Sequence, residues 1–225
     1  MNYGIIVAAG KSERLGPEVD KAFLTLGTKP VLAYSIIAFQ ECTAIDAIVL
    51  VVRKDRLAAA RSLVQIYGCF KVRHIVAGGA QRQDSVLNGL EQLPDEALIV
   101  AVHDGARPCV TPAIIIETIN SAKEHGSGVA AVKVTDTIKE VERGMKVTRT
   151  IDRARVWAVQ TPQTFKRLQL IDALKKARKA KAVVTDEASA MENAGHEVHL
   201  VPSSWANLKI TVPADIPVAA ALLKV

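Results

Sequence analysis

Short apolar runs alternate along the chain with stretches whose apolar residues are spaced as in a helix. The runs carry β-branched and other apolar residues at consecutive positions, and they cover Tyr3–Ala8, Ala47–Val52, Val72–Ala77, Leu98–Val102 and Gly128–Val134. Such runs are typical of strands buried on both faces of a parallel sheet. The helical stretches cover Pro30–Gln40, Lys54–Tyr67, Gln81–Leu93 and Pro112–His125. The alternation predicts an α/β, Rossmann-like, doubly wound fold with a mainly parallel twisted sheet flanked by helices.

The pattern changes after Val134, where polar and apolar residues alternate. The segments Asp136–Val141 and Lys146–Ile151 flank Glu142-Arg143-Gly144, which predicts a β-hairpin arm over about residues 135–155. An isolated hairpin is only marginally stable in water, so we expect this arm to join two chains as a homodimer; a solvent-exposed flap of a monomer is the alternative. Helical and strand patterns then return at Leu168–Arg178, Asp186–Asn193, Glu197–Val201 and Ala214–Leu223.

Length and composition narrow the class of protein. The 225 residues, 49% of them hydrophobic, suit one domain over 1–225 with the arm as a subdomain. The net charge of +6 favours a polyanionic ligand, but with 4% aromatic residues the chain offers few stacking platforms for nucleic acid. No apolar run is long enough to span a bilayer and none resembles a signal peptide. Cys42, Cys69 and Cys109 lack metal or disulfide spacing, which predicts free thiols in the cytoplasm.

The unusual residues gather where three predicted strands end. The first strand runs into Ala8-Ala9-Gly10, the third into Gly78–Ser85, and the fourth into His103-Asp104-Gly105-Ala106-Arg107-Pro108. In an open α/β sheet, ligands bind beyond the carboxyl ends of the strands. The three loops therefore predict a single ligand site on one edge of the sheet.

The first loop has features of a phosphate-binding turn. Gly10-Lys11-Ser12 resembles the end of a Walker A motif, but the glycine needed five residues earlier is replaced by Ile5. What remains is a small-residue turn that lets backbone N–H groups approach phosphate oxygens, followed by the cations Arg14 and Lys21. Taken alone, the loop is equally compatible with an ordinary tight turn.

Together, the motifs resemble those of the 2-C-methyl-D-erythritol 4-phosphate cytidylyltransferase family. They are Ala8-Ala9-Gly10-x-x-x-Arg14-Leu15 with Lys21, then Arg82-x-x-Ser85, then His103–Pro108, and then Thr185-Asp186-Glu187-Ala188-Ser189. The order covers nearly the whole chain, including the late segment Asn207-Leu208-Lys209. The first motif is shared by many nucleotidyltransferases, whereas the third and fourth together are much more specific.

The resemblance implies a role for each matching residue in a transfer from CTP to a small sugar-alcohol phosphate. Residues implied to bind CTP are Ala8, Ala9, Gly10, Gly79, Arg82, Ser85, Asp104 and Gly105. Residues implied to hold the second substrate are Arg107, Thr137, Arg153, Thr161 and Thr185. Arg14 and Lys21 would stabilise the transition state, and Lys209 with Arg153 would steer the substrate phosphate. Mg²⁺ would be held mainly by the CTP phosphates, without a dedicated set of protein metal ligands.

Three positions depart from the family pattern, and several functional alternatives stay open. Asp20 and Ala22 flank Lys21 where the family often has Pro and Gln, and Ala80 replaces an acid found in some relatives. Asp20 could pair with Lys21 or help hold Mg²⁺. The alternatives are a ribitol-5-phosphate cytidylyltransferase, a nucleotide-binding module without catalysis and, from charge alone, a nucleic-acid-binding protein.

Other candidate residues have simpler structural interpretations. An anionic phosphate nucleophile needs no general base, so we interpret His103 as structural. Asp186 and Glu187 are adjacent on a predicted helix and point in different directions, which favours a role in capping the helix over acid–base catalysis. We expect Trp157 and Trp205 to pack and Arg143 and Lys146 to be solvated.

Overall fold

The computed structural model describes residues 1–10, 20–182 and 184–225. A seven-stranded sheet has the order β11-β7-β10-β6-β1-β4-β5. Its strands are β1 (Asn2–Ala8), β4 (Ala47–Val52), β5 (Val72–Ala77), β6 (Ile99–Asp104), β7 (Ser127–Lys133), β10 (Trp157–Lys166) and β11 (Leu200–Pro202). Only β10 among them is antiparallel to its neighbours, β6 and β7. The predicted mainly parallel α/β fold is therefore confirmed.

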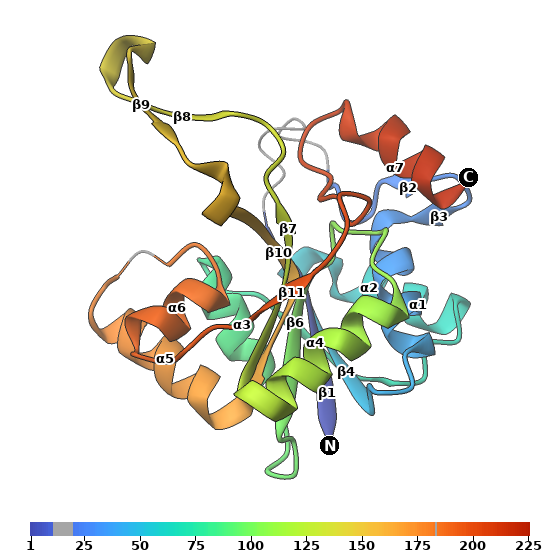
Figure 1. The fold of residues 1–225 in the computed structure, drawn as a ribbon. Helices are drawn as coiled ribbons and strands as arrows, with labels where there is room; N and C mark the ends of the chain where they lie inside the picture. Colours follow the sequence, from blue (N-terminus) through green and yellow to red (C-terminus); the bar gives the residue numbers. More distant parts are fainter. Residues whose placement is uncertain (11–19, 183) are drawn as a thin grey trace.

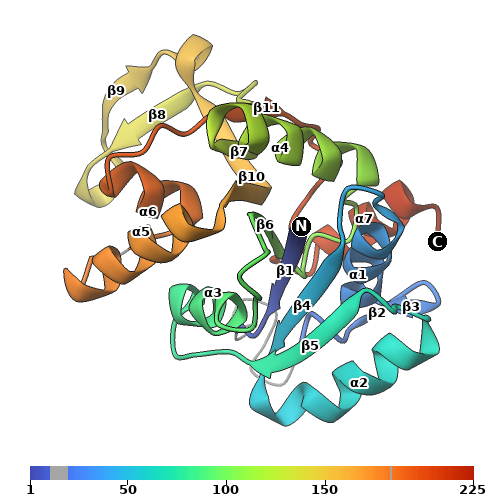
Figure 2. The same cartoon turned by 90° about the horizontal axis from the view of Figure 1, so that it is seen from below.

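Helices cover both faces of this sheet (Figures 1 and 2). One face carries α1 (Val31–Glu41), α2 (Leu57–Ile66) and α4 (Pro112–His125), and the other carries α3 (Arg82–Leu90), α5 (Arg167–Lys179) and α6 (Glu187–Asn193). Consecutive strand residues point to opposite faces, so Ile6 packs in the first core and Ile5 in the second. No helix in the described part of the chain is long and apolar enough to cross a membrane.

A smaller third cluster lies beside this sandwich. The helix α7 (Asp215–Leu223) packs near the short strands β2 (Thr25–Leu26) and β3 (Lys29–Pro30). Leu26, Val31, Ile210 and Ala219 are its buried residues. Because Ile210 follows Lys209 directly, this cluster anchors the segment that carries Lys209.

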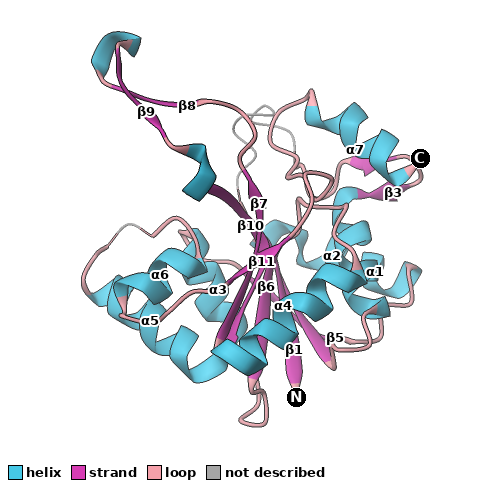
Figure 3. Cartoon of the chain, in the orientation of Figure 1, coloured by secondary structure: helices cyan, strands magenta, loops and turns pink. Residues whose placement is uncertain are grey.

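The arm is a two-stranded hairpin of β8 (Ile138–Val141) and β9 (Val147–Ile151). Figure 3 shows it projecting away from the helices and the sheet, from the edge at which β7 ends and β10 begins. Gly144 at the tip has a φ of 79°, a conformation that glycine adopts without strain. The predicted hairpin is confirmed in position and shape.

The sequence prediction is wrong at two places in the sheet. The prediction places no strand between the arm and α5, where the structure has β10. It also begins the last strand at Glu197 instead of Leu200. The inner half of β10 is buried although it carries Gln160, Thr161, Gln163 and Thr164. Because these side chains are polar, β10 lacks the run of consecutive apolar residues that identifies the other buried strands in the sequence.

Candidate active site

A cavity of about 640 Å³ lies at the carboxyl ends of β1 and β6, in the size range of small-molecule sites. It brings together the three predicted loops, because residues from all three line it: Val7, Ala8, Ala9, Gly10, Gly79, Ala80, Gln81, Arg82, Ser85, Asp104 and Ala106. Lys21, Ala22 and Lys209 complete the lining. A second cavity of about 200 Å³ adjoins it and shares Arg82, Asp104 and Lys209.

The Ala8–Gly10 loop and the Gly78–Ser85 loop are in close contact at Gly78. A Cβ on Gly78 would lie 2.3 Å from the Cβ of Ala9 and 2.8 Å from Ser85 Oγ, so only glycine fits there. Ser85 Oγ accepts from the Gly79 backbone N–H at 3.1 Å and donates to the Gln81 carbonyl at 3.1 Å. The Ser85 side chain thereby fixes the backbone that forms one wall of the cavity.

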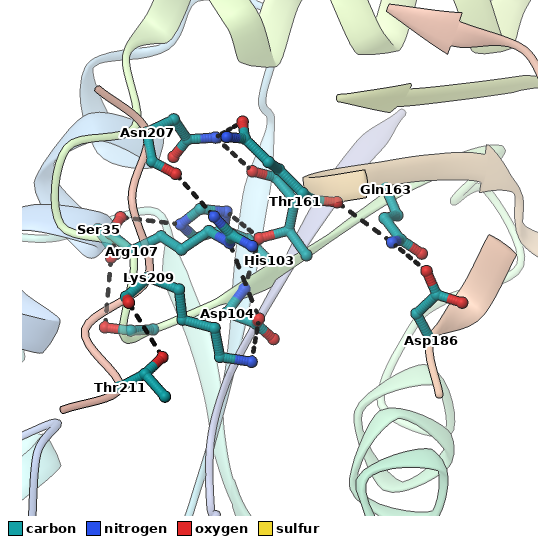
Figure 4. Close-up of polar contacts among 12 residues, drawn as sticks. Ser35, His103, Asp104, Arg107, Thr161, Gln163, Asp186, Asn207, Lys209 and Thr211 are labelled. Carbon is teal, nitrogen blue, oxygen red and sulfur yellow. Dashed lines mark hydrogen bonds and ion pairs between the residues drawn. The ribbon is translucent and has the colours of Figure 1, made fainter. Parts of the chain in front are cut away.

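Asp104 is the centre of the charged part of the site. Its Oδ1 accepts from Arg82 Nη2 at 3.1 Å, and its Oδ2 lies 2.8 Å from Lys209 Nζ and 3.9 Å from Arg107 Nε. Figure 4 shows the Lys209 side chain extending to the Asp104 carboxylate. Burial alone would raise the pKa of Asp104, but Arg82, Lys209 and Arg107 outweigh it and hold the pKa far below its usual range. Asp104 is therefore a fixed anion among three cations.

Glu187 is a member of this site that the sequence analysis assigned to a helix cap. Its carboxylate is 1% exposed and accepts from Arg82 Nη1 at 2.5 Å. The pKa of Arg82 is raised, because the two carboxylates outweigh the opposing effect of burial. The capping role falls to Asp186, whose Oδ1 accepts from the Ser189 N–H at 2.9 Å, while Ser189 Oγ accepts from the Asp186 N–H at 3.3 Å. No signal in the sequence pairs Glu187 with Arg82, 105 residues earlier.

His103 and Thr161 form a buried support beneath Asp104. Burial lowers the pKa of His103 to about 3, so the ring is neutral. Its Nε2 lies 3.3 Å from the Arg107 carbonyl, which can only accept, so the ring proton is on Nε2. The Thr161 hydroxyl then donates to His103 Nδ1 at 3.0 Å and accepts from the Asp104 N–H at 3.1 Å. The structural interpretation of His103 agrees with these contacts.

The structure distributes the residues implied by the resemblance over three regions. Those that line the larger cavity are Ala8, Ala9, Gly10, Lys21, Gly79, Arg82, Ser85, Asp104 and Lys209. Arg107, Thr161 and Thr185 line the smaller one, with Arg82, Asp104 and Lys209 lining both. Thr137 and Arg153 lie exposed on the arm and line neither cavity. Arg14 falls outside the described residues.

Gly105 has a packing role beneath the site. A Cβ at this position would lie 2.8 Å from Leu32 Cδ1 and 3.1 Å from the Cβ of Ala8. Its backbone N–H donates to the Val7 carbonyl at 2.9 Å. The glycine therefore lets the end of β6 lie against β1.

Asp20 has a partner that the sequence did not suggest. Its Oδ2 accepts from Arg56 Nε at 2.9 Å, and its Oδ1 accepts from the Ala22 N–H at 3.2 Å. These contacts hold the chain on either side of Lys21. Ala80 lines the larger cavity, where its methyl group leaves room that an acidic side chain would fill.

The donor set of the site bears on how a metal ion could be held. Among the described residues, no three His, Cys, Asp or Glu side chains cluster as metal ligands. Asp104 is the carboxylate that lines both cavities, and each of its oxygens already faces a cation. This arrangement fits an ion that takes most of its ligands from a bound polyphosphate.

Comparison with known proteins links this site to one family. The family model described as 2-C-methyl-D-erythritol 4-phosphate cytidylyltransferase matches residues 3–225. The protein of that name from Alkaliphilus oremlandii is 42% identical over 221 residues, 98% of this chain and 94% of the relative, and the one from Clostridium novyi is 41% identical over 224 residues, 99% and 96%. A solved 4-diphosphocytidyl-2C-methyl-D-erythritol synthase from Anaerococcus prevotii has a TM-score of 0.86 at 29% identity, covering 100% of this chain and 98% of its own.

Proposed function

The chain belongs to the 2-C-methyl-D-erythritol 4-phosphate cytidylyltransferase family, and we propose that the two adjoining cavities perform the transfer from which that family takes its name. The enzyme transfers the cytidylyl group of CTP to 2-C-methyl-D-erythritol 4-phosphate, giving 4-diphosphocytidyl-2-C-methyl-D-erythritol and pyrophosphate. One observation carries the assignment of the cavities. They meet at Asp104 and its cations Arg82 and Lys209, where two phosphorylated substrates could be brought together.

The larger cavity is the place for CTP in this proposal. Its volume and its rim of backbone from Ala8 to Gly10 suit a nucleotide with phosphates. Gly79 and Ser85 form the wall that would contact the cytidine part. The smaller cavity, lined by Arg107, Thr161 and Thr185, would take the sugar-alcohol phosphate. The Thr161 hydroxyl already bonds to His103 and the Asp104 N–H, which favours a supporting role for Thr161 over direct substrate binding.

The chemistry requires positive charge more than proton transfer. A phosphate oxygen of the acceptor attacks the α-phosphorus of CTP, the new P–O bond forms, and the bond to the leaving pyrophosphate breaks. The nucleophile is already anionic, so no general base is needed. Lys21 and Lys209, which line the larger cavity, would offset repulsion between the two anions and stabilise the crowded phosphorus. Arg14 would join them, as the family resemblance implies.

Mg²⁺ would be held in this site mainly by the phosphates of CTP. Among the described side chains, Asp104 is the one carboxylate that lines the larger cavity, and both of its oxygens already face cations, which disfavours it as a principal metal ligand. When bound, the ion would screen phosphate charge and orient the leaving group. The chain's own contribution is to position the phosphates with Lys21, Lys209 and the backbone of Ala8–Gly10.

The arm is the proposed route to a homodimer. It leaves the sheet at the same edge as the cavities (Figure 1), and its residues Thr137 and Arg153 are exposed and line neither cavity of their own chain. A second copy would give these side chains a site to act on. We propose that each arm reaches the substrate cavity of the partner chain, where Arg153 would help steer the acceptor phosphate.

One assay tests the function and its closest alternative. The protein is incubated with CTP, Mg²⁺ and either 2-C-methyl-D-erythritol 4-phosphate or ribitol 5-phosphate, and pyrophosphate release is measured. We expect release with the methylerythritol phosphate. Release with ribitol phosphate alone would reassign the acceptor, and release with neither would favour a nucleotide-binding module without catalysis.

A further inference from the structure

Glu187 is a buried carboxylate that the reaction as described does not use. Its Oε1 accepts from Arg82 Nη1, while its Oε2 is buried and has no hydrogen-bond partner among the described residues. A charged group that is so poorly solvated is costly to keep, which points to a function beyond packing. Its one partner, Arg82, lines both cavities. Among the described residues, the hydrogen bond to Arg82 is therefore what links the Glu187 carboxylate to the site.

The residues on both sides of Glu187 are fastened to the central sheet, Asp186 through its side chain and Ala188 through its backbone N–H. Gln163 on β10 donates from Nε2 to Asp186 Oδ2 at 2.8 Å and accepts at Oε1 from the Ala188 N–H at 2.9 Å. Figure 4 shows the Gln163–Asp186 contact at the start of α6. Gln163 is itself buried. The residues before and after Glu187 are thus fixed by one side chain, which leaves its carboxylate little freedom to follow Arg82.

The three nitrogens of the Arg82 guanidinium are divided between two carboxylates. Nε and Nη2 both bond to Asp104 Oδ1, at 3.3 Å and 3.1 Å, while Nη1 bonds to Glu187. Asp104 Oδ2 lies 2.8 Å from Lys209 Nζ, with Arg107 Nε farther away at 3.9 Å. Building on the proposed function, we propose that Glu187 is a positioning residue: it holds Arg82 to one oxygen of Asp104 so that the other oxygen stays with Lys209.

Loss of the Glu187 charge would change this division. The Arg82 Nη1 donor, no longer bound to Glu187, would be attracted to Asp104 Oδ2. This oxygen already faces Lys209. Competition between Arg82 and Lys209 for Asp104 would move the lysine from its place between the two cavities. A displacement of about 1 Å in a positioning group can reduce turnover by about a hundredfold.

The first test compares Glu187→Gln with Glu192→Gln. Both changes remove one negative charge from α6, but Glu192 is exposed. We expect Glu187→Gln to lower kcat at least about tenfold and to raise the KM for the acceptor phosphate, with the KM for CTP changed less than about threefold. Glu192→Gln should match the wild type. Equal kcat for the two variants, or a loss confined to the KM for CTP, would overturn the proposal.

A double-mutant cycle with Arg82→Met separates positioning from general stability. If Glu187 acts through Arg82, Glu187→Gln should change kcat less than about twofold in the Arg82→Met background, and it should raise the Tm of that background because it removes an unpaired buried charge. The same kcat loss in both backgrounds would refute the mechanism. If Glu187→Gln does not fold, Glu187→Asp replaces it and must also lower kcat, since its carboxylate is drawn back from Arg82. Wild-type protein inactive with CTP and methylerythritol phosphate would instead refute the proposed function.

Discussion

The charged cluster at the sheet edge and the arm are both rich in ion pairs, but the environments of these pairs differ. In the sheet-edge cluster of Arg82, Asp104, Arg107, Glu187 and Lys209, side-chain exposure ranges from 1% to 36%. Each described member has a partner within the same chain, and all of these pairs except Arg107–Asp104 join elements far apart in the sequence. Removing one member leaves another charge poorly solvated, which is costly in a buried setting.

In the arm the charged pairs are open to solvent. Glu142 pairs with Lys146, and Glu140 pairs with Arg149, with side chains 51% to 79% exposed. Exposed pairs of this kind contribute about 0–1 kcal/mol to stability. The arm's charges therefore do little for its own folding.

The contrast separates two sources of function in one molecule. The charges of the sheet-edge cluster pair with one another within one chain, and we propose that this cluster binds phosphate there. Thr137 and Arg153 on the arm line neither cavity of their own chain, so we expect any effect of theirs on catalysis to come through a second chain. Substitutions in the two regions should consequently behave differently when mutant chains are mixed.

The largest expected effect is at Lys21, which lines the larger cavity together with members of the sheet-edge cluster. Lys21→Ala should lower kcat by about a hundredfold, the size seen when one preorganised donor to a developing charge is removed. CTP should still bind, because the backbone of the nucleotide loop is retained. Steady-state kinetics and CTP titration measure the two quantities separately. Lys123→Ala, which removes an exposed cation from α4, is the matched control and should have wild-type kinetics. Near wild-type turnover in Lys21→Ala would remove this residue from the mechanism.

The second effect tests whether the arm works in the partner's site. Arg153→Ala should lower kcat about tenfold or more, although Arg153 lines neither cavity of its own chain. Unfolding and refolding an equal mixture of Arg153→Ala and Lys21→Ala chains makes about half of the dimers mixed. Each mixed dimer has one site with both defects and one with none, so activity should recover to about a quarter of wild type. Activity no higher than the mean of the two parents would show that Arg153 serves its own chain.

The sequence predicted that three loops share one site because the signals for this are local. Ala8 and Asp104 end strands whose apolar runs are clear in the sequence, and the strand ends of a parallel sheet share one edge. The ends of α4 were also predictable, since Pro112 begins the helix and Gly126, with a φ of 90°, terminates it. The location in the cytoplasm and the dimer remain predictions.

Two parts of the site were not predicted from the sequence, for different reasons. The strand β10 is buried yet polar, because Gln160 and Thr161 serve hydrogen bonds to Asn207 and to the Asp104 backbone, and no apolar period marks it. Glu187 was assigned to a cap because Asp186 beside it has the typical capping chemistry. Its partner Arg82 lies 105 residues away, and no local pattern encodes a contact of that range.

A third prediction concerns the buried support of the cluster and its response to pH. The pKa of His103 is about 3 in the folded protein, against about 6.5 in an unfolded chain. The unfolded state therefore binds a proton that the folded state does not, so stability is full above about pH 6.5 and falls by up to about 1.4 kcal/mol per pH unit below it. His103→Asn lacks this term, so its stability deficit relative to wild type should shrink between pH 7 and pH 5. Urea unfolding at several pH values gives the two curves; parallel curves would contradict a neutral buried His103.

The smallest expected effect is at the tip of the arm. Lys146→Ala removes a side chain that is 79% exposed and paired only with Glu142 among the described residues. Its stability should stay within about 0.5 kcal/mol of wild type, and its kcat should be unchanged. In the chain-mixing experiment, Lys146→Ala chains should complement Arg153→Ala and Lys21→Ala chains to the same level as wild-type chains do. The reason is that Lys146→Ala retains both Arg153 and Lys21. A marked loss of activity in Lys146→Ala alone would mean that the tip itself contacts the partner's site, and the functional part of the arm would then extend from Arg153 to its end.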